Sequence, residues 1–217
     1  MGHIKPMKFL LPSSLLACLL TFASFISERK SATSNTPPSP LASYSAAWND
    51  AKYLKCNTAT QANYMSSAEK EVIYVLNLAR MSPTLFANTV LKKYPARHTN
   101  YYTSLLDTML KIKPAKILYP DSLCFAGAYC HALNSGKEGY VGHYRSTDEC
   151  RKKWYYTGEC CDYGHNKPLD IIMSLLIDEG VESLGHRKIC LGNYKKIGVS
   201  IQPHTTYRHN TVIDFHY

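Results

Sequence analysis

Apolar residues recur at helical spacing in the part of the chain that follows residue 65. The stretch from Ser66 to Glu69 has the spacing of a capping box, in which a serine and a glutamate close the first turn of a helix. Apolar side chains then fall three or four positions apart, at Ala68, Val72, Val75, Leu76 and Ala79. This pattern predicts a first helix that buries one stripe of its surface.

Proline and cap residues place the next helices. Pro83 follows a serine and suits the first position of a helix, where the missing N–H costs nothing. A short apolar segment over 105–110 predicts one or two further helical turns before Pro114. Asp121 is a good N-cap for a clearer helix, which we expect to stop at the Asn-Ser-Gly sequence of 134–136.

The last third of the chain alternates between helical and strand patterns. Residues 168–180 begin with proline, end with glycine and carry an apolar face between them, which predicts a helix. The aromatic stretch 154–157 predicts an extended segment. Alternating apolar residues over 197–201 and 213–215, with a polar turn over 203–210, predict a hairpin. Helices before and around a few short strands favour an α+β fold.

The N-terminal part of the chain lacks this periodicity. Residues 1–27 carry two early lysines and then an apolar run, which is typical of a signal peptide, with a retained membrane anchor as the alternative. Residues 31–47 have the composition of a flexible linker and are expected to lie outside the fold. We therefore expect a linker and N-terminal extension over 28–65, and a folded domain over 66–217.

Composition and charge limit the classes of partner. A chain of 217 residues, 45% of them hydrophobic, is long enough for one well-cored domain and short for two. The net charge of +9 favours anionic surfaces, but lysine and arginine are dispersed, and the longest basic cluster is the three residues 151–153. No specific nucleic-acid binding is expected. The pattern indicates a basic, secreted protein that is loosely attracted to cell envelopes.

Cysteine content supports secretion. Of eight cysteines, Cys18 lies in the predicted leader, and the other seven predict three disulfides with one thiol left over. The favoured pair joins Cys150 to Cys160 or Cys161, because a separation of ten or eleven residues lets the chain fold back as a hairpin. Cys190 is the predicted partner of the remaining vicinal cysteine. The seven candidates are Cys56, Cys124, Cys130, Cys150, Cys160, Cys161 and Cys190.

An ordered set of short motifs runs through the predicted domain. In sequence order the landmarks are Asn77-Leu78-Ala79-Arg80, His143, Gly158-Glu159, Gly185-His186-Arg187, Ile197-Gly198-Val199 and Asp214-Phe215. On these residues the chain resembles a domain of the CAP superfamily (cysteine-rich secretory protein, antigen 5 and pathogenesis-related 1) from Ser67 to Phe215. The resemblance implies a secreted, SCP-like extracellular domain with a three-layer α-β-α sandwich around a central, mostly antiparallel sheet.

The same resemblance implies a polar cleft. In CAP domains two histidines and two acidic residues line a central cavity, and the ligand cleft here would comprise His143, Glu159, Asp178 or Glu179, His186 and the adjacent Arg187. Arg187 is expected to pair with a carboxylate near the cleft. Two imidazoles suit Zn²⁺ or another divalent cation, which makes His143 and His186 candidate metal ligands. The alternative is a hydrogen-bonded polar cluster in a wet cleft.

Two classes of function remain open at this point. The preferred one is a secreted binding module, monomeric or weakly dimeric, whose cleft takes a small ligand, a lipid or a divalent metal. Its surface would engage a cell-envelope or protein partner. The alternative is a metal-dependent extracellular hydrolase with His143 and His186 as ligands and Glu159, on a loop, as general base. A purely adhesive role is the third reading, and an enzyme is the less favoured class.

Overall fold

The computed structural model describes residues 1–3 and 37–217, and Pro37–Tyr217 form one compact unit. The predicted signal peptide, 1–27, therefore lies outside the described residues apart from its first three. Within the described ranges, no helix has both the length and the apolar character needed to cross a membrane.

A four-stranded sheet forms the middle of this unit, in the order β1-β3-β4-β2. The strands are β1 (Tyr119–Pro120), β2 (Gly158–Tyr163), β3 (Lys196–His204) and β4 (Arg208–His216). Only β1 and β3 pair in parallel, whereas β3 with β4 and β4 with β2 are antiparallel. The predicted hairpin is thus confirmed as β3 and β4, with a turn that is shorter than expected because the strands extend to His204 and from Arg208.

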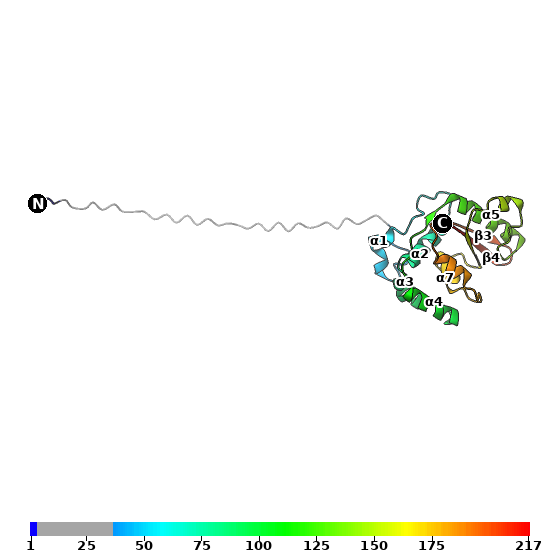
Figure 1. The fold of residues 1–217 in the computed structure, drawn as a ribbon, viewed down its shortest axis with the longest axis horizontal. Helices are drawn as coiled ribbons and strands as arrows, with labels where there is room; N and C mark the ends of the chain where they lie inside the picture. Colours follow the sequence, from blue (N-terminus) through cyan, green and yellow to red (C-terminus); the bar gives the residue numbers. More distant parts are fainter. Residues whose placement is uncertain (4–36) are drawn as a thin grey trace. The chain divides into compact units, whose positions relative to one another are not determined.

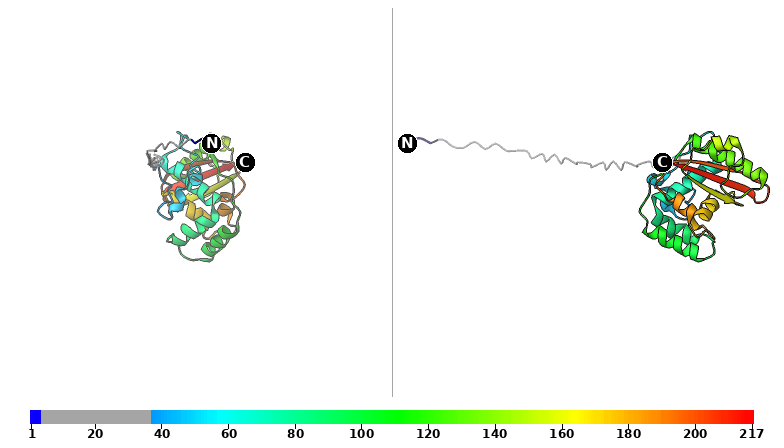
Figure 2. Two further views of the ribbon diagram at one scale, coloured as in Figure 1. Left: turned by 90° about the vertical axis from the view of Figure 1, so that its left-hand side faces the viewer. Right: turned by 45° about the vertical axis from the view of Figure 1, so that its right-hand side comes forward.

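Helices cover both faces of the sheet (Figure 1). Helix α5 (Ser122–Glu138) packs along β3 and β4, while α2 (Ser67–Met81) contacts β3, and α7 (Pro168–Ile177) and α8 (Gly185–Cys190) contact β2. Figure 2 shows α5 on one side of the strands and the other long helices on the opposite side. The predicted α+β class, with an α-β-α layering and a mostly antiparallel sheet, is confirmed.

Shorter helices complete the fold. The structure has α3 (Pro83–Thr89), η2 (Leu91–Lys93) and α4 (Asn100–Lys111) after the first long helix, and α6 (Asp148–Lys152) before β2. Pro83 occupies the first turn of α3, and the helix predicted around 105–110 is α4, which is longer than the sequence pattern indicated.

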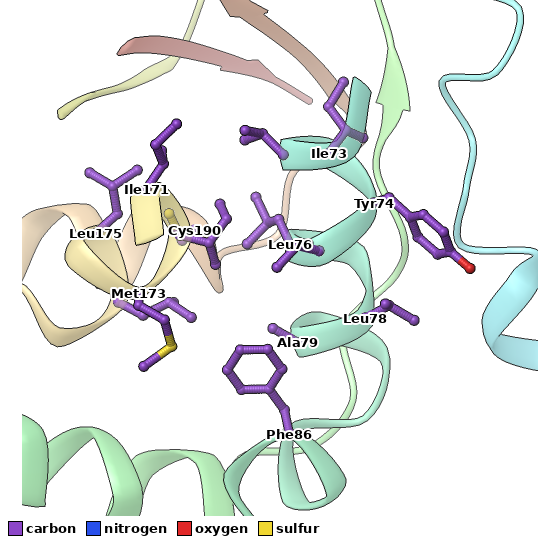
Figure 3. Packing of buried hydrophobic residues seen from close by; sticks show 14 of the residues in the cluster. Ile73, Tyr74, Leu76, Leu78, Ala79, Phe86, Ile171, Met173, Leu175 and Cys190 are labelled. Atoms are coloured by element: carbon purple, nitrogen blue, oxygen red, sulfur yellow. The ribbon is translucent and has the colours of Figure 1, made fainter. Parts of the chain in front are cut away.

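Helix α2 is the centre of the larger hydrophobic core. Ser66 and Glu69 form the predicted capping box. Side chains from α2, α3, α7 and α8 meet in this core, as Leu76, Phe86, Met173 and Cys190 show in Figure 3. The prediction of one buried stripe is wrong, because every residue from 72 to 80 is buried.

The two polar residues of the Asn77–Arg80 motif explain that burial. The Asn77 side chain accepts a hydrogen bond from the Leu118 N–H at 2.7 Å and donates to the Leu118 carbonyl at 3.0 Å. The Arg80 guanidinium donates to the carbonyls of Lys116, Cys190 and Gly192. These side chains satisfy buried backbone groups of neighbouring loops, so a helix with polar residues can be covered on all sides.

Helix α5 corrects the expected stop at 134–136. Asp121 caps it as predicted, but the helix continues to Glu138 and ends at Gly139, which has a left-handed φ of 69°. Gly136 lies inside the helix because the β3 backbone crosses it closely: a Cβ there would be 2.1 Å from the Pro203 oxygen. Gly198 has the converse role on β3, where a Cβ would be 2.0 Å from the Phe125 nitrogen. Both glycines permit close helix–sheet packing.

The N-terminal extension is part of the fold from about residue 39. It contains η1 (Ala46–Asn49) and α1 (Ala51–Leu54), and the side chains of Leu41 and Trp48 are fully buried. The Trp48 indole N–H donates to Thr89 Oγ1 at 3.0 Å. The expectation that 31–47 lies outside the fold is therefore wrong for its second half. An irregular segment can bury single large side chains without showing any periodicity.

The predicted cysteine pairing is wrong. Within 37–217 the structure contains one disulfide, Cys130–Cys150, and Cys56, Cys124, Cys160, Cys161 and Cys190 are buried free thiols. Cys150 therefore does not pair with the vicinal cysteines. Neighbouring residues of a strand point to opposite faces of the sheet. Cys160 therefore belongs to the larger hydrophobic core, and Cys161 belongs to a smaller hydrophobic cluster that β2 and β4 form with α5.

Candidate functional site

His143 and Glu159 form the first half of the candidate site. His143 lies in the loop between α5 and α6, and its Nδ1 is 2.8 Å from Glu159 Oε1. Glu159 is buried, whereas about half of the His143 side chain is exposed, at 55%. The expectation of a loop carboxylate is wrong, because Glu159 lies in β2 and pairs in register with Asp214 of β4. The sheet therefore fixes its backbone.

His186 and Asp178 form the second half. Asp178 directly follows α7 in a left-handed conformation, with φ 59° and ψ 43°. Its Oδ1 is 2.7 Å from His186 Nδ1, and its Oδ2 accepts the backbone N–H of Arg187 at 3.2 Å. The Asp178 carboxylate thus fixes both the imidazole and the first turn of α8.

The two imidazoles lie next to each other. Their ring centroids are 6.1 Å apart, with 38° between the ring planes. Because each Nδ1 faces a carboxylate, Nε2 is the ring nitrogen that these contacts leave free on both His143 and His186. The structure therefore brings together four of the predicted residues, namely His143, Glu159, Asp178 and His186.

Two predicted residues take other roles. Glu179 lies next to Asp178, but its carboxylate accepts a hydrogen bond from Thr99 Oγ1 at 2.6 Å. Arg187 does not pair with a cleft carboxylate through its side chain. Its guanidinium is buried and donates to the carbonyls of Leu176, Ile177 and Tyr101 and to Ser104 Oγ. Arg187 thus closes the end of α7 and anchors it to α4, because the last carbonyls of a helix need partners.

A cavity of about 380 Å³ extends from His186 along α7. Asp178, Glu179 and Cys161 line it together with a third histidine–carboxylate pair, His165 and Asp162, whose atoms are 3.1 Å apart. The sequence analysis did not identify this pair. The hydrogen bond to Asp162 raises the pKa of His165 against the opposing effect of burial.

A buried arginine connects the Glu159 half to the sheet, and the sequence analysis missed it. Arg145 Nη2 is 2.5 Å from Glu159 Oε2 and 3.0 Å from Asp214 Oδ2, and all three side chains are almost fully buried. Arg145 Nη1 also donates to the Gly127 carbonyl at 2.6 Å. Asp214 appeared only as a motif landmark. Nothing in the sequence distinguishes Arg145 from the other dispersed basic residues.

Charge in this network is divided unequally. Burial favours a raised pKa for Glu159, but the hydrogen bond from His143 and the charge of Arg145 outweigh it and lower that pKa. Burial raises the pKa of Asp214 well above its usual value despite Arg145, and Glu159 adds to the rise. Of the two carboxyls, Glu159 is therefore the one that more readily carries the negative charge beside Arg145. The hydrogen bond to Glu159 raises the pKa of His143, although burial opposes this.

A buried group next to this network has residue types that could hold a metal. His131, Glu159 and Cys161 each offer a ligand atom, and these atoms lie within 4.8 Å of one another. Their other contacts fit a hydrogen-bonded cluster better. His131 Nε2 is 2.9 Å from the Gly142 carbonyl, and both Glu159 oxygens are engaged. Burial raises the pKa of the Cys161 thiol well above its usual value, which disfavours the thiolate that metals require.

Comparison with known proteins adds little. No family model matches the chain, and no curated protein matches it. Among solved structures the chain is similar to an outer surface protein from Borrelia burgdorferi, with a TM-score of 0.37 and 17% identity. That match covers 46% of this chain and 77% of the other. Such a likeness is too distant to carry an argument, so the geometry of the site has to support any assignment.

Proposed function

We propose that this protein is a secreted CAP-like binding module that holds a divalent cation, Zn²⁺ most readily, between His143 and His186. One observation carries the proposal: two histidine–carboxylate pairs lie with their rings 6.1 Å apart, and each ring has its Nδ1 committed to a carboxylate. Metal-binding histidines are commonly oriented in this way, with the second ring nitrogen bonded to a carboxylate.

The residues fit a weak, open metal site. Zinc binds imidazole nitrogen at about 2.0–2.1 Å, so two rings that share one tetrahedral ion have centroids roughly 5 Å apart, and the rings here, at 6.1 Å, would approach each other by about 1 Å on binding. Glu159 and Asp178 already use their oxygens for His143, Arg145, His186 and the Arg187 N–H. Two imidazoles would therefore be the protein ligands, and water would complete the shell. The cavity beside His186 leaves room for a small ligand on the ion.

The hydrolase alternative is less well supported. A general base needs a free oxygen within reach of the water that it activates. Glu159 is only 3% exposed, and its oxygens face His143 and Arg145. The lowered pKa of Glu159 also makes it a weaker base than an ordinary glutamate. Its contacts favour a positioning role for His143.

Calorimetric titration with Zn²⁺ tests the proposal. We expect about one equivalent to bind, and His143→Ala and His186→Ala each to weaken binding by at least tenfold, because one imidazole leaves too few ligands. His98→Ala, which removes an exposed histidine elsewhere, is the matched control and should have no effect.

Two outcomes would contradict the proposal. Zinc binding that persists in the double variant His143→Ala/His186→Ala would place the metal elsewhere. A hydrolase screen that finds chelator-sensitive turnover, abolished by Glu159→Gln at unchanged stability, would support the enzyme instead. We expect Glu159→Gln to lower thermal stability with no turnover to lose.

A further inference from the structure

A larger cavity, of about 710 Å³, lies away from the histidine pairs. Four separate parts of the chain form it: α1 with the two residues after it, the end of α2, residues 115–119, and the residue before β3. We call it the lysine-rimmed cavity after Lys52, Lys55, Lys116 and Lys195, which all line it. Its volume is within the usual range for small-molecule sites, about 300–1,000 Å³.

The interior of the lysine-rimmed cavity is apolar. Cys56 is fully buried, and its Sγ is 3.1 Å from Met81 Sδ. Ile117 and Ala115 add aliphatic surface from the segment before β1. Burial raises the pKa of Cys56 to about 11, so its thiol is neutral at physiological pH. This floor offers nothing that would bind a polar group strongly, and it suits hydrocarbon.

The rim has the opposite character. All four lysines are exposed, and within 37–217 none of them forms an ion pair. Among the residues that the structure describes, no aspartate or glutamate lines the cavity. Several positive charges around one low-dielectric opening attract an anion, because no acidic residue there compensates them. The ligand that matches both features has an anionic head and an apolar body.

We propose that the lysine-rimmed cavity binds a long-chain fatty acid, with the acyl chain over Cys56, Met81 and Ile117 and the carboxylate among the lysines. A cavity of this size can enclose a single acyl chain, whereas a lipid bilayer would contact only the lysines around its opening. This site is independent of His143 and His186, so it adds a second ligand to the binding module.

Calorimetry on the full-length chain with palmitate, laurate and hexadecanol tests the two features separately. We expect one palmitate to bind, and the affinity to fall by about fourfold for each methylene that is removed from a buried chain. Hexadecanol keeps the chain and lacks the charge, so it should bind at least tenfold more weakly than palmitate. Raised salt should weaken palmitate but not hexadecanol.

Variants locate the binding. Ala115→Trp fills the cavity and should abolish palmitate binding, and Ile117→Asn, which makes the floor polar, should weaken it if the tryptophan variant does not fold. Lys52→Gln with Lys55→Gln should weaken palmitate about tenfold. Lys137→Gln with Lys152→Gln removes the same charge from exposed positions elsewhere and should change affinity by less than twofold. His186→Ala should leave palmitate binding intact even if zinc binding is lost.

Four results would overturn the proposal. Palmitate that still binds to a folded Ala115→Trp protein would lie elsewhere. Equal affinity for hexadecanol would remove the role of the lysines. Binding to phosphatidylserine vesicles without any binding of free palmitate would indicate a membrane surface. A concentration-dependent dimer in light scattering that Ala115→Trp abolishes would show that a second copy covers the cavity.

Discussion

The two halves of the histidine site are held in different ways. The carboxylate of Glu159 depends on contacts that are more distant in sequence: Arg145 is 14 residues away, and it also binds Asp214, which lies 69 residues after the arginine. Asp178 depends on its neighbours, because its partners His186 and the Arg187 N–H are only eight and nine residues away. The Glu159 half is thus built into the sheet, whereas the Asp178 half is a local turn between α7 and α8.

This difference affects what each carboxylate can do. Glu159 is one of two buried carboxyls that share a single arginine, so its charge is part of what holds β2, β4 and the His143 loop together. Asp178 occupies a left-handed position at the end of a helix, and one carboxylate there satisfies both a side chain and a backbone N–H. Changes in the first half should therefore disturb the fold, and changes in the second should mainly disturb His186.

Removal of Arg145 should have the largest effect. Arg145→Met leaves the ionised Glu159 buried without its cation, and loss of one partner of a buried ion pair costs about 3–5 kcal/mol. Urea denaturation measures the change in the free energy of unfolding. Lys153→Met breaks the exposed pair with Glu149 and is the control, with almost no expected loss, because solvent screens such a pair.

A second variant makes this test specific. Arg145→Met combined with Glu159→Gln removes the uncompensated charge and should recover part of the lost stability. If Arg145→Met alone costs less than about 1 kcal/mol, the network is not what stabilises the first half, because a buried charge without a partner costs more than that.

Asp178→Ala should have an intermediate effect. It removes a buried acceptor from His186 and from the Arg187 N–H, and buried groups that lose a partner cost about 1–3 kcal/mol. We expect about 2 kcal/mol from thermal unfolding, with weaker zinc binding because His186 is no longer oriented. Asp178→Asn keeps an acceptor and tolerates the left-handed backbone, so it should cost less. A loss larger than that of Arg145→Met would reverse the comparison between the halves.

The same contrast explains what could be read from the sequence. Helices could be predicted from local features, namely apolar periodicity, the Ser66 and Asp121 caps and Pro83. The alternation of apolar and polar residues predicted the β3–β4 hairpin. Those signals need only near neighbours along the chain.

What the sequence left open depends on contacts that are distant along the chain. Arg145 could not be identified, because its importance comes from its ion pairs with Glu159 and Asp214, which lie in strands further along the sequence. The cysteine pairing was wrong for a related reason: the side on which Cys160 and Cys161 emerge depends on the register of β2, and the proximity of Cys130 to Cys150 depends on how α6 packs under α5. Gly136 was misread because the β3 backbone that requires it is far away in sequence.

The smallest expected effect is on the titration of His143, and it reports the first half without unfolding it. The hydrogen bond to Glu159 raises the pKa of His143 above the ordinary value of 6.5, although burial opposes the rise. A histidine whose pKa is higher in the folded state adds stability that is complete below pH 6.5 and is lost as the pH rises through the folded value. The stabilisation is small because His143 is half exposed and solvent screens the pair.

NMR titration of the imidazole signals measures this effect directly. It should show the raised pKa of His143 in the wild type and a value closer to 6.5 in Glu159→Gln. His165, whose pKa is raised by Asp162 instead, is the internal control and should titrate identically in both proteins. A His143 signal that does not respond to Glu159→Gln would mean that the carboxylate does not set its charge, and the first half would then position the ring through packing alone.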